Sequence, residues 1–457
     1  MQLNNRIISP GTAGEHLSHL SDEFSIINNP AYIFPPFEIL PLASKISTKR
    51  DHIAAFVTDM DGTTTTTEEL CLYSLEFMIR TMSGKLTVGD WHGLDKTIDY
   101  PYVIGNSTTK HVEFLINRYS NFINKNFTSK ALIKAMVWQL IFGKDKVRKE
   151  EIINNIKHFK LDELLTDPKF EKLLNTNNLN EFNLSDELIY LMQNYSPVFD
   201  SLNHSVLVKI GIDIYYYKYH EILERLKSGK SREIALELFN DENKNLIEPM
   251  PGIGIFLALI KGWLGDNIQL FVNLLIDEYK KKSNAVFICN DKEKLIADLI
   301  QLANRFTNQP AKIGIVTSSI FFEADIVLTE LFNVIKKQFL KLDLNDSIKQ
   351  ELAEKFTHYS LVYDTIATAS DTNEIRLKPH RDLYSIALHN LHIPKNEFIN
   401  VIGMEDSESG TIAIRAAGIG FCIAVPFTQT NFHNFDAASV IAYGGLPELI
   451  LRHKLFL

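Results

Sequence analysis

The sequence has very few cysteines. Cys71, Cys289 and Cys422 are widely spaced along 457 residues and form no CxxC pair. Isolated thiols of this kind build neither a disulfide framework nor a cysteine-rich zinc site. Their scarcity is typical of a reducing compartment, so we expect a cytoplasmic location.

The sequence also lacks a long apolar run and a basic stripe. No stretch approaches the ~18 apolar residues of a membrane span, and residues 1–10 do not show the charged and apolar regions of a secretory signal. The net charge of -9 is spread over the chain, which argues against nucleic acid. A composition of 45% hydrophobic and 23% charged residues is ordinary for a globular protein with buried cores. We expect neither a membrane nor a nucleic-acid partner, and composition leaves the oligomeric state open.

What the sequence does contain is an acidic peptide directly after an apolar run. Residues 53–56 predict a buried strand, and Asp59 and Asp61 follow in the peptide Val-Thr-Asp-Met-Asp-Gly-Thr-Thr. Ligands of open α/β sheets bind at the carboxyl ends of the strands. One acid two residues from another suits a nucleophile beside a proton donor. The alternative is a solvated turn, because Asp and Gly are common in turns.

The remaining periodicity predicts a sheet interrupted by a helical module. Residues 1–50 contain scattered prolines and predict an irregular extension lying over the main domain. A helix is predicted over Glu68–Ser83, and the chain is then rich in helical periodicity up to about residue 310. Afterwards short apolar runs over 313–316, 359–363, 398–402, 420–425 and 439–441 alternate with amphipathic stretches. This alternation predicts an α/β fold with a parallel sheet covered on both faces.

Polar groups also follow three later predicted strands. They are Thr317 with Ser318, Lys378, and Glu405 with Asp406. If the strands are parallel, these groups converge with Asp59 and Asp61 on one crevice. Taken singly, Lys378 reads equally as a surface lysine, and Glu405 and Asp406 as first-turn acids of a helix.

This set of groups suits phosphoryl transfer, whose transition state needs a nucleophile, donors and cations. Asp59 would attack phosphorus, and Asp61 would protonate the leaving oxygen and then activate water. Lys378 would balance the charge of the acids and the phosphoryl group. We expect phosphate contacts from Gly62, Thr63, Thr317, Ser318 and Lys378. We expect Mg²⁺ to be held by Asp59, Asp61, Glu405 and Asp406.

Four short motifs resemble those of the haloacid dehalogenase superfamily. They are Asp59-Met60-Asp61-Gly62-Thr63, Thr317, Leu377-Lys378-Pro379 and Glu405-Asp406-Ser407. Residues 403–426 are similar to the β-phosphoglucomutase-like branch. The resemblance implies a Rossmann-like core, a helical cap inserted after the first motif, Mg²⁺ and an aspartyl-phosphate. With this resemblance we expect an extension at 1–50, core at 51–84, a cap at 85–250, a return to the core at 251–263 and core again at 311–457. The large cap and a helical insertion at 264–310 depart from the pattern of that family.

One loop of the predicted cap is similar to the substrate-reading loop of that family. It contains Asn106, Ser107 and Lys110, and Lys110 would meet a second anionic group of the substrate. The alternative is a capped helix start.

The sequence thus predicts a Mg²⁺-dependent phosphohydrolase of a small phosphorylated metabolite. A phosphosugar mutase is the alternative enzyme, and a binding or scaffold protein that retains the fold without turnover is the alternative from another class. Asp61 argues against dehalogenation, because expulsion of a halide needs no protonated leaving oxygen.

Overall fold

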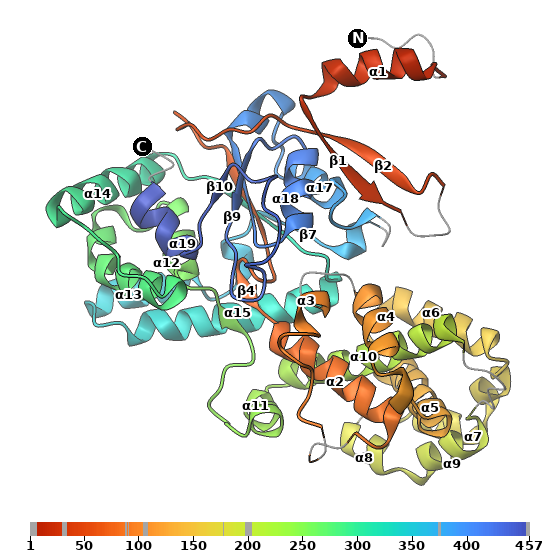
Figure 1. Cartoon of the computed structure of the whole chain (residues 1–457). Coiled ribbons are helices and arrows are strands. Elements are labelled where there is room, and N and C mark those ends of the chain that lie inside the picture. The colour runs from red at the N-terminus through yellow and green to blue at the C-terminus, as the bar shows by residue number, and fades with distance from the viewer. Residues whose placement is uncertain are drawn as a thin grey trace. The chain divides into compact units, whose positions relative to one another are not determined.

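The chain forms two structural units (Figure 1). The computed structural model describes residues 7–29, 34–86, 89, 91–103, 108–176, 178–196, 203–372 and 376–453. One unit, here called the core unit, comprises residues 1–67 and 247–457; the other, the helical unit, comprises residues 68–246. The helical unit is therefore an insertion in the core unit.

The core unit is built on a parallel sheet of six strands in the order β10-β9-β8-β3-β6-β7. The strands are β3 (Ala55–Asp59), β6 (Lys312–Val316), β7 (Thr365–Ala367), β8 (Val401–Glu405), β9 (Phe421–Ala424) and β10 (Val440–Ile441). The chain runs from β3 to β6 on one side and later returns to β8 on the other. The carboxyl end of β3 thus lies where the strand order reverses, which is the usual ligand position in such sheets. The predicted α/β fold with a Rossmann-like sheet is confirmed.

Alternate residues of β3 explain why helices cover both faces. Ala55 and Val57 pack with α17 (Asp382–Asn390) and α18 (Glu408–Ala416) on one face. Phe56 contacts Phe256 of α12 (Ile253–Ile260) and Phe306 of α14 (Lys292–Asn308), with ring centres 5.4 and 6.2 Å away. A strand covered on both faces has no polar side, and every residue of β3 is buried.

The two connections to the helical unit run side by side in the core unit. The two-residue strands β4 (Thr65–Thr66) and β5 (Glu248–Pro249) pair as a short antiparallel ribbon. The hydroxyl of Thr65 also donates a hydrogen bond to the carbonyl of Glu248 at 2.9 Å. The outgoing and returning segments are therefore joined where they leave the sheet.

The helical unit begins earlier than the predicted cap. Its first helix, α2 (Glu68–Ser83), has the predicted bounds, but it packs against α5 (Lys125–Phe142) and α10 (His204–Lys227) of its own unit. The apolar stripe of α2 finds its partners there, so the division falls after Thr67 and not at residue 85. The other helices of this unit are α3 (Tyr100–Val103), α4 (Thr108–Arg118), α6 (Lys146–His158), α7 (Pro168–Leu173), α8 (Leu179–Leu184), α9 (Asp186–Asn194) and α11 (Ser231–Phe239). Across the described ranges, no helix combines the length and the apolar character needed to cross a membrane.

Two details after residue 263 differ from the sequence prediction. The apolar run 359–363 is not a strand; it begins with the 3-10 turn η4 (Tyr359–Leu361), and β7 follows it. Aromatic packing explains the run, because the ring of Tyr363 lies 5.7 Å from that of Phe332. Lys378 does not end a strand but lies in the turn before α17. The predicted insertion contributes α13 (Val272–Ser283) and α14, which belong to the core unit.

The N-terminal segment is more ordered than its prolines suggested. It contains α1 (Pro10–Leu20) and an antiparallel hairpin of β1 (Glu23–Asn28) and β2 (Phe37–Leu42). Pro10 starts α1, where a missing N–H costs nothing, and Ser9 caps the helix. The hairpin packs against α18, whose buried Arg415 donates to the carbonyl of Ala43 at 2.8 Å and pairs with Glu23. The prediction of an irregular segment was therefore wrong.

We expect Arg415→Met to loosen the hairpin. The substitution leaves the Ala43 carbonyl without its donor and Glu23 without its cation, at a cost of about 2 kcal/mol. Limited proteolysis should then cut the first 45 residues faster, and urea unfolding should start at lower concentration. Lys45→Met is the matched control, because Lys45 is an exposed partner 4.0 Å from Glu23. Equal behaviour of the two variants would contradict this role of Arg415.

Candidate active site

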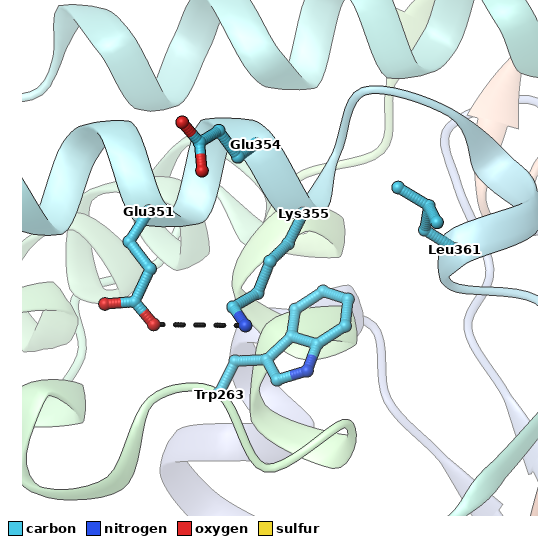
Figure 2. Close-up of a pocket in the computed structure, with 5 residues that line it drawn as sticks. All are labelled: Trp263, Glu351, Glu354, Lys355 and Leu361. Carbon is cyan, nitrogen blue, oxygen red and sulfur yellow. Dashed lines mark ion pairs between the residues drawn. The ribbon is translucent and has the colours of Figure 1, made fainter.

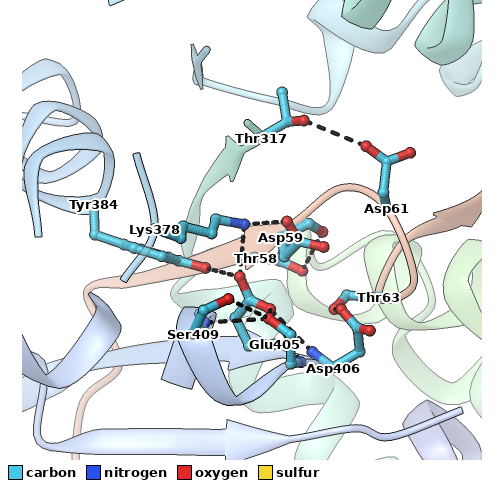
Figure 3. Close-up of polar contacts among 12 residues, drawn as sticks. Thr58, Asp59, Asp61, Thr63, Thr317, Lys378, Tyr384, Glu405, Asp406 and Ser409 are labelled. Atoms are coloured by element: carbon cyan, nitrogen blue, oxygen red, sulfur yellow. Dashed lines mark hydrogen bonds and ion pairs between the residues drawn. The ribbon is translucent and has the colours of Figure 1, made fainter. Parts of the chain in front are cut away.

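At the end of β3, the buried carboxylate of Asp59 lies beside Lys378, whose side chain is only 9% exposed. Lys378 forms an ion pair with Asp59 and a second one with Glu405, whose Oε1 lies 2.6 Å from Nζ (Figure 3). Burial would lower the pKa of Lys378, but Asp59 and Glu405 outweigh it, so the pKa lies above its ordinary value and the lysine is charged. Burial and the neighbouring Glu405 raise the pKa of Asp59, against the opposing charge of Lys378. One cation therefore serves two carboxylates.

Both carboxylate oxygens of Glu405 accept hydrogen bonds. Its Oε1 accepts from the hydroxyl of Tyr384 at 2.9 Å, and its Oε2 accepts from the hydroxyl of Ser407 at 3.0 Å. A Cβ at Gly410 would come within 1.8 Å of the carboxyl carbon. Burial and Glu405 raise the pKa of Tyr384, so the phenol remains a donor. Sequence reasoning missed Tyr384, since a tyrosine inside an apolar helix pattern gives no separate signal.

Asp61 is held by two threonines. The hydroxyl of Thr67 donates to its Oδ1, and the hydroxyl of Thr317 donates to its Oδ2 at 3.3 Å. Burial raises the pKa of Asp61, and these hydrogen bonds oppose the rise. In Figure 3 the Asp61 side chain points toward Thr317. The structure thus separates Asp61 from the carboxylates that surround Lys378.

Gly62 gives the loop after β3 the shape that brings it against Asp406. Its φ of +89° suits glycine, and a Cβ there would lie 2.6 Å from the Asp406 carboxyl and 2.8 Å from the ring of Phe427. The hydroxyl of Thr63 donates to Asp406 Oδ1 at 3.5 Å. The threonine run also shapes this loop, because Thr64 donates to the carbonyl of Asp59 at 2.7 Å.

We expect Gly62→Ala to destabilise the core unit by roughly 3 kcal/mol, from the left-handed φ together with the close contact. The melting temperature of the variant should fall clearly. Gly265→Ala separates the two causes, because Gly265 also has positive φ but would place its Cβ no closer than 3.6 Å to a neighbour. The Gly265 variant should lose about 1 kcal/mol. A loss at Gly62 no larger than at Gly265 would show that the contact with Asp406 is unimportant.

Three acids of the site could hold a metal ion. Oxygens of Asp59, Glu405 and Asp406 lie within 4.8 Å of one another. Asp59 Oδ2 is buried and accepts no hydrogen bond from the described residues. A set of carboxylate oxygens suits Mg²⁺. The side chain of Asp61 is not in this group, because Thr67 and Thr317 hold it elsewhere.

The remaining residues predicted for the site have different positions. Ser318 follows Thr317 and is exposed. Lys110 is exposed on α4 of the helical unit. Asn106 and Ser107 lie outside the described residues. The substrate-loop prediction therefore stays a prediction.

A shallow depression elsewhere in the core unit has a volume of about 330 Å³. Its lining consists of Trp263, Glu351, Glu354, Lys355 and Leu361 (Figure 2). Lys355 lies over Trp263, with Nζ 5.3 Å from the ring centre, and its Nζ is 3.9 Å from Glu351. Lys355 thus has partners within the depression, which contains none of the acids of the strand-end site.

The fold and the site define an α/β protein with two separately held aspartates at the end of its central strand and a lysine that pairs with one of them. The Rossmann-like α/β core is the fold that the resemblance to the haloacid dehalogenase superfamily implies. No family model and no curated protein matches the sequence.

Solved structures give distant likenesses. The chain is similar to CbbY from Rhodobacter sphaeroides in complex with phosphate, at 15% identity and a TM-score of 0.38, over 87% of this chain and 96% of that one. It is similar to β-phosphoglucomutase from Clostridium difficile at 16% identity and a TM-score of 0.33, over 88% of this chain and 97% of that one. A third similar structure is a proposed phosphoglycolate phosphatase from Lactobacillus delbrueckii. Its identity is 13% and its TM-score 0.34, over 88% of this chain and 99% of that one. Likenesses this weak carry no argument about the reaction, which must rest on the site residues.

Proposed function

We propose that this chain is a phosphohydrolase of the haloacid dehalogenase type, which acts on a small phosphorylated metabolite with Mg²⁺. The observation that carries the proposal is Asp59: one of its oxygens pairs with Lys378, and the other is buried without a hydrogen bond from the described residues. A buried carboxylate oxygen with no donor at a ligand-binding strand end is a suitable nucleophile.

The residues divide the reaction between them. Asp59 attacks phosphorus while the ester P–O bond breaks, and Asp61 gives its proton to the leaving oxygen. Burial favours the protonated form of Asp61 for this step, because it raises the pKa of that carboxyl. Asp61 then takes a proton from water, which attacks phosphorus and breaks the bond to Asp59. Inorganic phosphate leaves and both aspartates return to their starting state.

Charge around the phosphoryl group is balanced by the same site. Lys378 offers its cation beside Asp59. Thr63, Thr317, Ser318 and the backbone near Gly62 are the proposed donors to phosphoryl oxygens. Asp59, Glu405 and Asp406 would hold Mg²⁺. When bound, the ion would neutralise negative charge on the phosphoryl group. Lys110 with Asn106 and Ser107 remains the proposed substrate loop of the helical unit.

A panel of phosphorylated sugars and hydroxy acids, incubated with MgCl₂, tests the proposal. Release of inorganic phosphate that needs both MgCl₂ and Asp61 supports a hydrolase, and Asp61→Asn should reduce it by roughly 10³-fold. Isomerisation that requires a bisphosphate primer would instead assign a phosphosugar mutase. Absence of both reactions with every compound would favour a binding protein.

A further inference from the structure

A second lysine reaches the Asp406 side of the site from the segment that the sequence presented as an insertion. Lys282 lies in the last turn of α13, and its Nζ is 5.8 Å from the ring centre of Phe427. Phe427 is the ring against which Gly62 packs so closely that a Cβ would lie 2.8 Å from it. Lys282 and the loop after β3 therefore lie next to the same aromatic ring.

The helix that carries Lys282 is fixed to the core unit. Helix α13 packs against α19 (Gly445–Glu448), and a Cβ on Gly445 would touch the Lys282 stem, with Cε at 3.3 Å. The adjoining turn of α13 is held as well, because Tyr279 is buried and contacts Gly444. The position of the Lys282 stem is thus set by packing.

The charge of Lys282 is only partly compensated. Among the described carboxylates, Asp406 is the one whose charge acts on Lys282 appreciably. Burial lowers the pKa of Lys282 to about 8, against the opposing effect of Asp406. By contrast Lys280, on the same helix, is exposed. A half-buried cation beside a cluster of acids has electrostatic room for an anion.

We propose that Lys282 is a second cation of this site, which binds an anionic oxygen of the phosphorylated substrate from the Asp406 side. The inference rests on the proposed function. The Lys282 ammonium repels a cation near Asp406 and attracts an anion there. Its removal should therefore raise the affinity for Mg²⁺ and lower the affinity for phosphate, which a role in packing alone would not do.

Isothermal titration calorimetry on the full chain tests this with MgCl₂ and with inorganic phosphate at saturating Mg²⁺. Lys282→Met should weaken phosphate binding about tenfold and tighten Mg²⁺ binding roughly threefold. Lys282→Arg should keep phosphate affinity within about threefold, because it keeps the charge. Lys280→Met, a change of the same type on the exposed side, should alter neither affinity appreciably.

The outcomes separate the two claims. Wild type that binds neither probe overturns the proposed function, and this inference with it. Wild type that binds both, together with a Lys282→Met variant that binds both equally well or both more weakly, overturns only the inference. If the Met variant does not fold, Lys282→Gln serves in its place, with a melting curve to show that it is folded.

Discussion

Asp59→Asn should abolish phosphate release, with a loss of at least ~10⁴-fold, while the protein stays folded. The amide keeps an oxygen for Lys378 but cannot form the covalent bond to phosphorus. The substitution also removes the buried negative charge of the Asp59 carboxylate. Burial and Glu405 raise the pKa of this carboxyl, so its charged form is disfavoured in the folded protein. Stability should therefore be equal to that of wild type or slightly higher. Phosphate release and urea unfolding, measured on the same preparation, check both parts.

Asp51→Asn provides the control for Asp59. Asp51 is exposed and precedes β3 at the end of the strand remote from the site, so its amide should behave as wild type. Turnover by folded Asp59→Asn at more than a few per cent of the wild-type rate would rule out Asp59 as the nucleophile.

Lys378→Met should have the second largest effect, on both stability and turnover. Removing the shared cation leaves Asp59 and Glu405 buried without compensation, which costs about 3–5 kcal/mol. Turnover should fall by roughly 10³-fold, because the phosphoryl group loses its neighbouring positive charge. Urea unfolding with and without MgCl₂ is the informative measurement. Mg²⁺ should stabilise the variant more than wild type, since the carboxylates then depend on the metal for their counter-charge.

Two further substitutions make the Lys378 result specific. Lys378→Arg keeps the charge and should recover part of the lost stability, although its planar head cannot reproduce the compact ammonium. Lys395→Met removes an exposed lysine and should change neither stability nor its dependence on Mg²⁺. A Lys378→Met protein as stable as wild type, with the same response to Mg²⁺, would contradict the shared-cation arrangement.

The sequence predicted the sheet and the strand-end acids because both depend on local pattern. Helix α2 was predicted with its observed bounds, and β6 within one residue, from apolar spacing alone. The strand placed at residues 359–363 failed because aromatic residues that pack in the core give the same apolar signal as a strand. The N-terminal hairpin was missed because its anchor, Arg415, is distant in sequence.

The site was predictable as far as its motifs reach and no further. Strand ends indicated Asp59, Asp61 and Asp406, and the structure brings all of them to one edge of the sheet. The hydrogen bond from Thr67 to Asp61 was not predicted, because Thr67 is one of several consecutive threonines and the sequence does not distinguish it from them. Lys282 was equally hidden, because it follows Lys280 and Lys281 and only tertiary contacts distinguish it from them.

The most direct test of the account is to locate the phosphorylated residue. Once a substrate is known, the protein is quenched with acid during turnover, reduced with tritiated borohydride and digested, and labelled peptides are sequenced by mass spectrometry. Borohydride labels the carbonyl carbon of an acyl phosphate. The account predicts label at Asp59 in wild type and none in Asp59→Asn. Label at another residue, or rapid phosphate release without any label, would contradict it.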